Sequence, residues 1–179
     1  MVDDGYALDS AVQRAARNQG IQLQQTRPSL EALRMAIRER RELFRPEQAR
    51  QLQEQRRVAL EAMRSLAGFR PRLIGSLIHG DGPLDRVRLL LIADTPEQVM
   101  MHLNDHHIPW RDAEVSLHYS ARRRVSRPAV RFVAGATAIE LIILDPGSRS
   151  DPPRDPISGG PLEMLDVDQL HALIEREGH

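Results

Sequence analysis

Arg72-Leu73-Ile74-Gly75-Ser76, followed after nine residues by Arg86-Val87-Arg88-Leu89-Leu90-Leu91, is the stretch that decides the expected fold. Its first part is an apolar run that ends in Gly-Ser, residues typical of a tight turn. Its second part begins with alternating charged and apolar side chains and then becomes wholly apolar, which is typical of a β-strand. We therefore predict strands over Arg72–Ile78 and Arg86–Ala93.

Three more apolar segments with β-branched residues follow, and turn-prone residues separate most of them. They predict strands over Glu114–Tyr119, Pro128–Val133 and Ala138–Leu144. Together with the first two, these segments make one mixed sheet of about five strands. The proline- and glycine-rich stretch from Asp145 to Pro161 predicts an ordered loop that lies over the domain.

Before Gly68 the chain is rich in Arg, Gln, Glu and Ala, which predicts helices. Proline near a first turn and apolar residues at helical spacing predict one helix after Pro28 and another after Pro46, and Tyr6–Asn18 is a further amphipathic segment. Later in the chain, two capping-box patterns predict a helix over Pro96–Asp105 and a terminal helix after Asp166.

These elements predict an α+β fold, with a helical N-terminal region packed on the mixed sheet and helices flanking that sheet. The expected division is an N-terminal helical region over residues 1–68 and an α/β domain over residues 69–179. A chain of 179 residues suits one compact unit of this kind.

Composition narrows the possible functions. The 25 basic residues balance the 25 acidic ones, so the whole molecule has no net field that would attract nucleic acid or an anionic membrane. All 25 basic residues are arginine, which excludes chemistry that depends on lysine. Cysteine is absent, which excludes disulfides and thiolate catalysis. No apolar run is long enough to span a membrane, and we expect a cytoplasmic protein.

The Gly75-Ser76 turn and its distance from the next strand resemble the signature of the DNA polymerase beta-like nucleotidyltransferase superfamily. In that superfamily a Gly-Ser turn holds nucleotide phosphates, and an Asp-x-Asp pair on the following strand holds magnesium. The order of several short motifs also resembles a group of uncharacterised bacterial nucleotidyltransferase-domain proteins, over most of the chain. These motifs are Glu61-Ala62-Met63-Arg64, Phe69-Arg70-Pro71, Ile92-Ala93-Asp94-Thr95, His107-Ile108-Pro109 and Pro156-Ile157-Ser158-Gly159-Gly160-Pro161-Leu162.

The chain departs from this pattern at Arg86 and Arg88, which stand where the resemblance places the two metal-binding carboxylates. Two divalent cations would be repelled by two fixed guanidinium charges in the same pocket. Glu140 matches the third carboxylate of the family, and it is the one charge within a strongly apolar run. Because an unpaired buried carboxylate is costly, we expect an ion pair between Glu140 and Arg86 or Arg88.

Two other interpretations of this segment stay open. In the first, Arg86 and Arg88 are only the polar side of a half-exposed strand. In the second, the Asp-x-Asp pattern is shifted by one residue, so that Asp85 becomes the first carboxylate. The second position is then Val87, so a two-metal site is incomplete in either register. Asp81, in a Gly-Asp-Gly-Pro turn, is a further candidate loop ligand, but this sequence favours ordinary turn chemistry.

We expect a nucleotidyltransferase-fold protein with a degenerate metal site that binds a nucleotide or phosphate, or serves as a regulatory module. Gly75, Ser76, Arg86 and Arg88 are the candidate phosphate-binding residues, and no metal is expected. One alternative is an active nucleotidyltransferase, in which Glu140 and Asp85 or Asp81 hold one Mg²⁺; Asp85 and Glu140 are then the candidate catalytic residues. Another is a structural protein whose helices form a homodimer.

Three further motifs have competing explanations. His102 and His106 stand four residues apart, a spacing that suits zinc, but a cationic His is also favourable at a helix C-terminus. Arg122-Arg123-Arg124 with Arg127 suits either phosphate contacts or a solvated hairpin tip. Trp110 suits a packing anchor better than a ligand platform.

Overall fold

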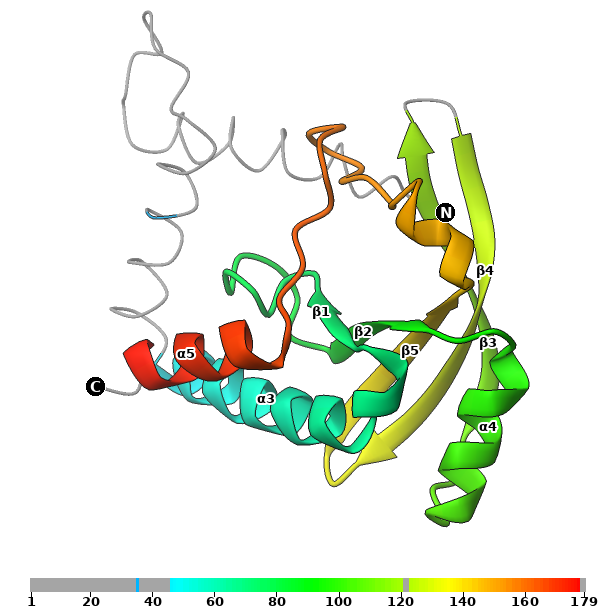
Figure 1. The fold of residues 1–179 in the computed structure, drawn as a ribbon. Coiled ribbons are helices and arrows are strands. Elements are labelled where there is room, and N and C mark those ends of the chain that lie inside the picture. The colour runs from blue at the N-terminus through cyan, green and yellow to red at the C-terminus, as the bar shows by residue number, and fades with distance from the viewer. Residues whose placement is uncertain (1–34, 36–45, 121–122, 178–179) are drawn as a thin grey trace, which may run out of the picture.

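The computed structural model describes residues 35, 46–120 and 123–177, and the helices predicted over Tyr6–Asn18 and after Pro28 lie outside these ranges. The described chain is α+β, as predicted (Figure 1). Its α-helices are α3 (Pro46–Ser65), α4 (Pro96–Asp105) and α5 (Val167–Glu177). Two short 3-10 turns, η1 (Ala67–Phe69) and η2 (Pro146–Arg149), connect larger elements.

Five strands form one mixed sheet in the order β1-β2-β5-β4-β3. The neighbours β2 and β5 are parallel, and the other adjacent pairs are antiparallel. The predicted five-stranded mixed sheet is therefore confirmed. The strands are β1 (Arg72–Ile74), β2 (Arg86–Ile92), β3 (Arg111–Ser120), β4 (Arg123–Ala134) and β5 (Thr137–Leu144).

The first strand is shorter than the sequence predicted. Gly75 has φ +87°, a left-handed conformation that ends the extended backbone after Ile74. Leu77 and Ile78 are buried, but they lie in a turn and not in the strand. Both side chains are apolar because they are buried. The sequence alone does not distinguish a buried turn from a buried strand, so the predicted strand extended too far.

By contrast, β3 and β4 are longer than predicted. They form a two-stranded antiparallel ribbon that extends beyond the rest of the sheet (Figure 1). Polar residues alternate with apolar ones along much of this ribbon, and the exposed positions carry charges that a search for apolar runs passes over.

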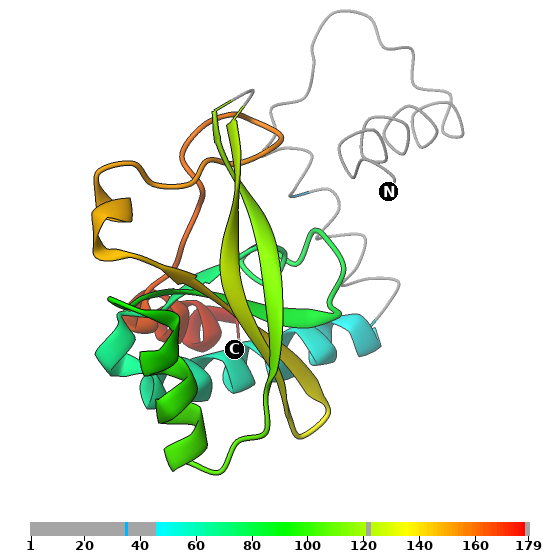
Figure 2. The same ribbon diagram turned by 90° about the vertical axis from the view of Figure 1, so that its right-hand side faces the viewer.

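All three described α-helices pack on one face of the sheet, where α3 and α5 lie side by side (Figures 1 and 2). Every second residue of the central strands points into this core, including Leu89 of β2 and Leu141 of β5, which have no exposed surface. Helix α3 contributes Ala59, Leu60 and Met63 to the same core, so it packs directly on the sheet.

The opposite face of the sheet is only partly covered. The loop segment after β5 runs back across it and contributes Leu162 and Met164 to a second apolar cluster around Leu90 and Ile142. Leu165 of this segment then pairs with Leu73 at the edge strand β1. Within the predicted loop, Arg154 pairs with His118 of β3, so this segment lies against the sheet as predicted, although η2 forms within it.

The two predicted capping boxes behave differently. At α5 the box forms in full, because Asp166 accepts from the backbone N–H of Gln169, and the side chain of Gln169 accepts from the backbone N–H of Asp166. Helix α4 begins at Pro96 as predicted, but the Thr95 side chain makes no capping hydrogen bond. There Gln98 accepts from the backbone N–H of Asp94 instead.

A search of the described helices found none that combines the length and the apolar character needed to cross a membrane.

Candidate functional site

The centre of the candidate site is Glu140, on the central strand β5. Its register partners are Arg88 on β2 and Arg131 on β4, so a guanidinium stands on each side of it. All three residues lie on the sheet face opposite the helices, in phase with Leu90 and Ile142. The Glu140 side chain is only 2% exposed, so its charge has to be compensated by protein groups.

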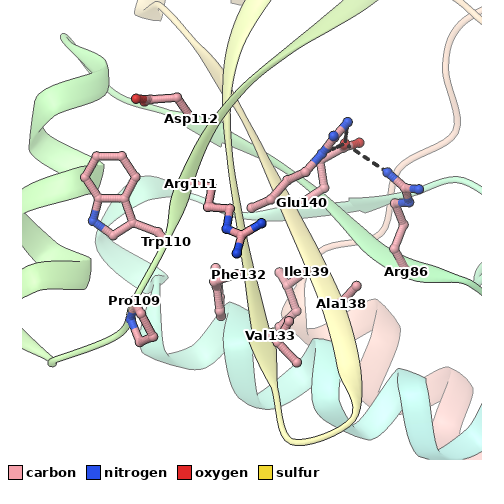
Figure 3. Close-up of a pocket in the computed structure, with 11 residues that line it drawn as sticks. Arg86, Pro109, Trp110, Arg111, Asp112, Phe132, Val133, Ala138, Ile139 and Glu140 are labelled. Carbon is pink, nitrogen blue, oxygen red and sulfur yellow. Dashed lines mark hydrogen bonds and ion pairs between the residues drawn. The ribbon is translucent and has the colours of Figure 1, made fainter.

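Three arginines provide that compensation. Arg88 Nε lies 2.8 Å from Oε2 of Glu140, while Arg131 places both Nε and Nη2 2.8 Å from Oε1. Arg86 Nη1 lies 3.4 Å from the same Oε1, a pair drawn in Figure 3. The predicted ion pair of Glu140 with Arg86 or Arg88 is confirmed, since both arginines contact it.

The arginines decide the charge state of Glu140. Burial alone would raise its pKa, but the hydrogen bond from Arg131 and the positive charge of Arg88 outweigh burial and hold the pKa below its usual value. Glu140 is therefore a carboxylate at neutral pH. The hydrogen bond that Arg86 donates to Asp85 raises the pKa of Arg86, with a further contribution from Glu140, so this guanidinium stays charged as well.

The cluster leaves part of each guanidinium unused. A guanidinium carries five N–H groups; towards Glu140, Arg88 uses one of them and Arg131 uses two. The side chains of Arg86, Arg88 and Arg131 are 37%, 38% and 51% exposed, so their outer edges face solvent. Glu140 thus fixes the inner edges of three cations and leaves outward N–H groups able to donate to an anion.

Asp85 does not take the role that a shifted register would give it. It precedes β2, and its carboxylate lies 2.9 Å from Arg86. Val87 has no exposed surface and belongs to the helix-side core, away from Glu140. The interpretation of Arg86 and Arg88 as merely the polar side of a strand is also insufficient, because both contact a buried carboxylate.

The Gly75-Ser76 turn lies next to this cluster. A Cβ atom at Gly75 would stand 3.9 Å from Cδ of Arg88, so the turn and the arginine are neighbours. The Ser76 hydroxyl donates to the Pro83 carbonyl, and this bond closes the loop before β2. Its single hydrogen is thus engaged within the loop, and a phosphate near Ser76 would have to rely on other donors.

Asp81 lies apart from Glu140, at a second hollow of about 550 Å³ between the start of α3 and the loop before β2. Asp85 borders the same hollow, and so do Gln48 and Gln51. Within residues 46–120 and 123–177, no three His, Asp or Glu side chains gather in a way that would hold a metal ion. Both carboxylate oxygens of Glu140 already contact guanidinium groups.

A pocket of about 570 Å³ lies where the starts of β2, β3 and β5 and the end of β4 come together (Figure 3). Arg86, Arg131 and Glu140 form one side of the pocket, and residues at the start of β3 form the other. Figure 3 shows Trp110 and Arg86 on opposite sides. A volume of this size is within the range of small-molecule sites. The lining residues are Arg86, Pro109, Trp110, Arg111, Asp112, Arg131, Phe132, Val133, Ala138, Ile139 and Glu140.

Sequence reasoning missed Arg131 and Arg111. The signal for Arg131 was present: Gly135 and Ala136 form a two-residue hairpin loop between β4 and β5, with Gly135 at φ +61°. Such a loop fixes Ala134 opposite Thr137, and three residues further along each strand it fixes Arg131 opposite Glu140. Arg111 had no local signal, because its place depends on the pairing of β3 with β4.

The other motifs lie elsewhere. The rings of His102 and His106 lie with their centroids 4.3 Å apart and tilted by 34° at the end of α4, and Phe69 contacts His102 edge-on. In the ribbon, Arg123 pairs with Asp151, while Arg127 lies 3.1 Å from Asp145. Both arginines also lie over the Tyr119 ring. These two arginines are therefore engaged with groups of the protein itself, and Arg122 lies outside the described residues.

Comparison of the chain with models of protein families, with curated proteins and with solved structures gave no match.

Proposed function

We propose that this protein is a binding module for nucleotides or other phosphate compounds, in which fixed arginines take the place of a divalent cation. The observation that carries the proposal is the set of three half-exposed guanidiniums held around the buried carboxylate of Glu140. Phosphate oxygens accept N–H groups from arginine in the same planar, charge-assisted geometry as a carboxylate does.

Charge and preorganisation support this proposal. The cluster of Arg86, Arg88, Arg131, Asp85 and Glu140 holds three positive and two negative charges, so it keeps an excess of one positive charge. The side chains are already held by Glu140 and Asp85, so binding an anion costs less conformational entropy than it would for free arginines. The Gly75 turn beside Arg88 leaves space for a ligand to approach the backbone.

The alternative of an active nucleotidyltransferase needs a cation beside Glu140. Three guanidiniums already occupy the contacts of that carboxylate, and Asp85 is bound to Arg86. A cation would have to displace these pairs against the repulsion of the arginines. The geometry therefore favours binding that is independent of magnesium over metal-dependent transfer.

Calorimetric titration with ATP, GTP, CTP and UTP, each with and without Mg²⁺, tests the proposal. We expect binding in the absence of Mg²⁺ that is no tighter in its presence. Binding that requires Mg²⁺ would instead support the enzyme, and no binding of any nucleotide would leave a structural or dimerising role.

A double substitution locates the site. Arg86→Gln with Arg88→Gln removes two outward-facing charges and should weaken nucleotide binding at least tenfold, since a hydrogen bond to a charged group contributes about 1.5–3 kcal/mol. Arg57→Gln, on the exposed side of α3, is the matched control and should leave binding unchanged. Circular dichroism and thermal denaturation of each variant separate loss of binding from loss of fold.

A further inference from the structure

The pocket beside Glu140 has a second half, formed by the start of β3, whose composition differs from that of the arginine cluster. Pro109, Trp110 and Arg111 lie there, opposite the end of β4 with Phe132 and Val133. Apolar and aromatic groups thus stand next to cationic ones within a single pocket. Figure 3 shows Arg111 between Trp110 and the Glu140 cluster.

The register of β3 and β4 places two like charges together in this pocket. Arg111 is the direct cross-strand partner of Arg131, an arrangement that is unfavourable in a sheet. Arg131 is compensated by Glu140, whereas Arg111 has no ion pair with any residue that the structure describes. Asp112, the nearest acidic neighbour in sequence, also lines the pocket, but no ion pair joins it to Arg111. An anion bound between Arg111 and Arg131 would remove this repulsion.

Trp110 is held in a fixed position at the same end of the pocket. Its indole Nε1 donates to Oδ1 of Asn104, 2.9 Å away on α4, and the side chain remains partly exposed. Part of the Trp110 side chain packs against the helix-side core, as expected of a packing anchor, and its remaining apolar surface borders the pocket, where a ligand can reach it. Planar aromatic groups stack on such a ring.

From this juxtaposition we infer that Arg111 and Trp110 form a specificity subsite for an aromatic organophosphate, and not for inorganic phosphate alone. Arg111 contacts the anionic group together with Arg131, and the Trp110 ring stacks on the aromatic body. The inference rests on the proposed function, because it assigns a second contact to the same anion site. Val133, which is 64% exposed and lines the same pocket, adds apolar surface for the aromatic part of the ligand.

Titrations with three probes test this subsite: inorganic phosphate, ribose 5-phosphate and AMP, all without Mg²⁺. AMP should bind about tenfold more tightly than ribose 5-phosphate, because base–aromatic stacking contributes this order of affinity. The chain contains one tryptophan, so its fluorescence reports Trp110 alone in the wild-type protein. AMP should quench this fluorescence, and ribose 5-phosphate should leave it nearly unchanged.

Substitutions separate the two contacts. Trp110→Leu should lower the affinity for AMP to that for ribose 5-phosphate and leave the affinity for inorganic phosphate unchanged. Trp110→Phe should keep most of the preference for AMP over ribose 5-phosphate. Arg111→Gln, at an exposed position, should lower the affinity for all three probes by a similar factor. Arg57→Gln is again the control, and calorimetry replaces fluorescence for the tryptophan variants.

Equal binding of AMP and ribose 5-phosphate, or an AMP preference that survives Trp110→Leu, would overturn the subsite and leave the anion-binding function intact. If none of the probes binds, the proposed function and the subsite fail together. The fluorescence measurement uses the unchanged protein, so it decides the question even if Trp110→Leu does not fold.

Discussion

Glu140 shows at the scale of a single residue how a buried charge is maintained. Its carboxylate is almost inaccessible to solvent, yet its pKa is lowered, because Arg131 and Arg88 outweigh the effect of burial. A carboxylate in this position is stabilised only while its partners remain. The same pairs hold the arginines in place, so one residue contributes to both stability and the geometry of the site.

Replacement of Glu140 by Gln should destabilise the protein by about 1–3 kcal/mol at pH 7, because the three arginines lose their common counter-charge. Urea denaturation of the wild type and of Glu140→Gln measures the difference. Glu97→Gln, at an exposed position on α4, is the control and should change stability by less than about 0.5 kcal/mol. A variant as stable as the wild type would show that the arginines do not need Glu140.

The stability difference between the wild type and Glu140→Gln should depend on pH. The pKa of Glu140 is lower in the folded protein than in the unfolded chain, where it is about 4.3. Its contribution is therefore fully present above about pH 4.3 and is lost as the pH falls through the folded-state pKa. The stability difference between wild type and Glu140→Gln should shrink below that pH; a difference that stays constant down to pH 2 would contradict this account.

At the scale of elements, the ends of α4 and α5 show that the same sequence pattern gives different caps. Asp166 and Gln169 exchange two hydrogen bonds at the start of α5, whereas the Thr95 side chain is not used at the start of α4. Pro96 at the first turn fixes the start of α4 even without that bond.

This difference predicts unequal effects of two matched substitutions. Asp166→Ala should cost about 1 kcal/mol, the usual value for a lost N-cap, while Thr95→Ala should cost less than about 0.5 kcal/mol. The ion pair of Asp166 with Arg72 is half-exposed and adds little. Chemical denaturation of both variants provides the measurement, and equal costs would show that Thr95 caps its helix in solution.

At the scale of the whole molecule, Arg56 joins three distant segments. It is 1% exposed, and it donates to the carbonyl oxygens of Leu77 and Ile78 and to Glu177 of α5. The turn that follows β1 and the last helix are thus held to α3 by one side chain. The same turn contains Gly75, which lies beside Arg88.

Arg56→Met keeps the length of the side chain but removes its donors, and it should cost about 3 kcal/mol because two buried carbonyl groups lose a donor and Glu177 loses the charge of Arg56. Arg57→Met, the adjacent exposed position, is the control and should be nearly neutral. Thermal denaturation compares the two. If both variants melt together with the wild type, Arg56 does not hold these segments.

The alternation of polar and apolar residues predicted which segments are strands and that Arg86 and Arg88 share one face. The cost of an unpaired buried charge predicted that Glu140 needs one of these arginines as a partner. Period-2 alternation is local, so it can be recognised without a structure. The end of β1 was wrong, because a buried turn and a buried strand have the same apolar composition at Leu77 and Ile78. The extent of β3 and β4 was underestimated because much of their surface is charged.

The sequence by itself determined the α+β class, the start of α4 and α5, and the need of Glu140 for a cationic partner, because each follows from local periodicity or from the cost of an unpaired buried charge. Tertiary structure alone decided that three arginines contact Glu140, that Arg111 stands opposite Arg131, and that Trp110 borders the same pocket. These depend on the order and register of strands far apart in the chain, and only the folded sheet fixes which strands become neighbours.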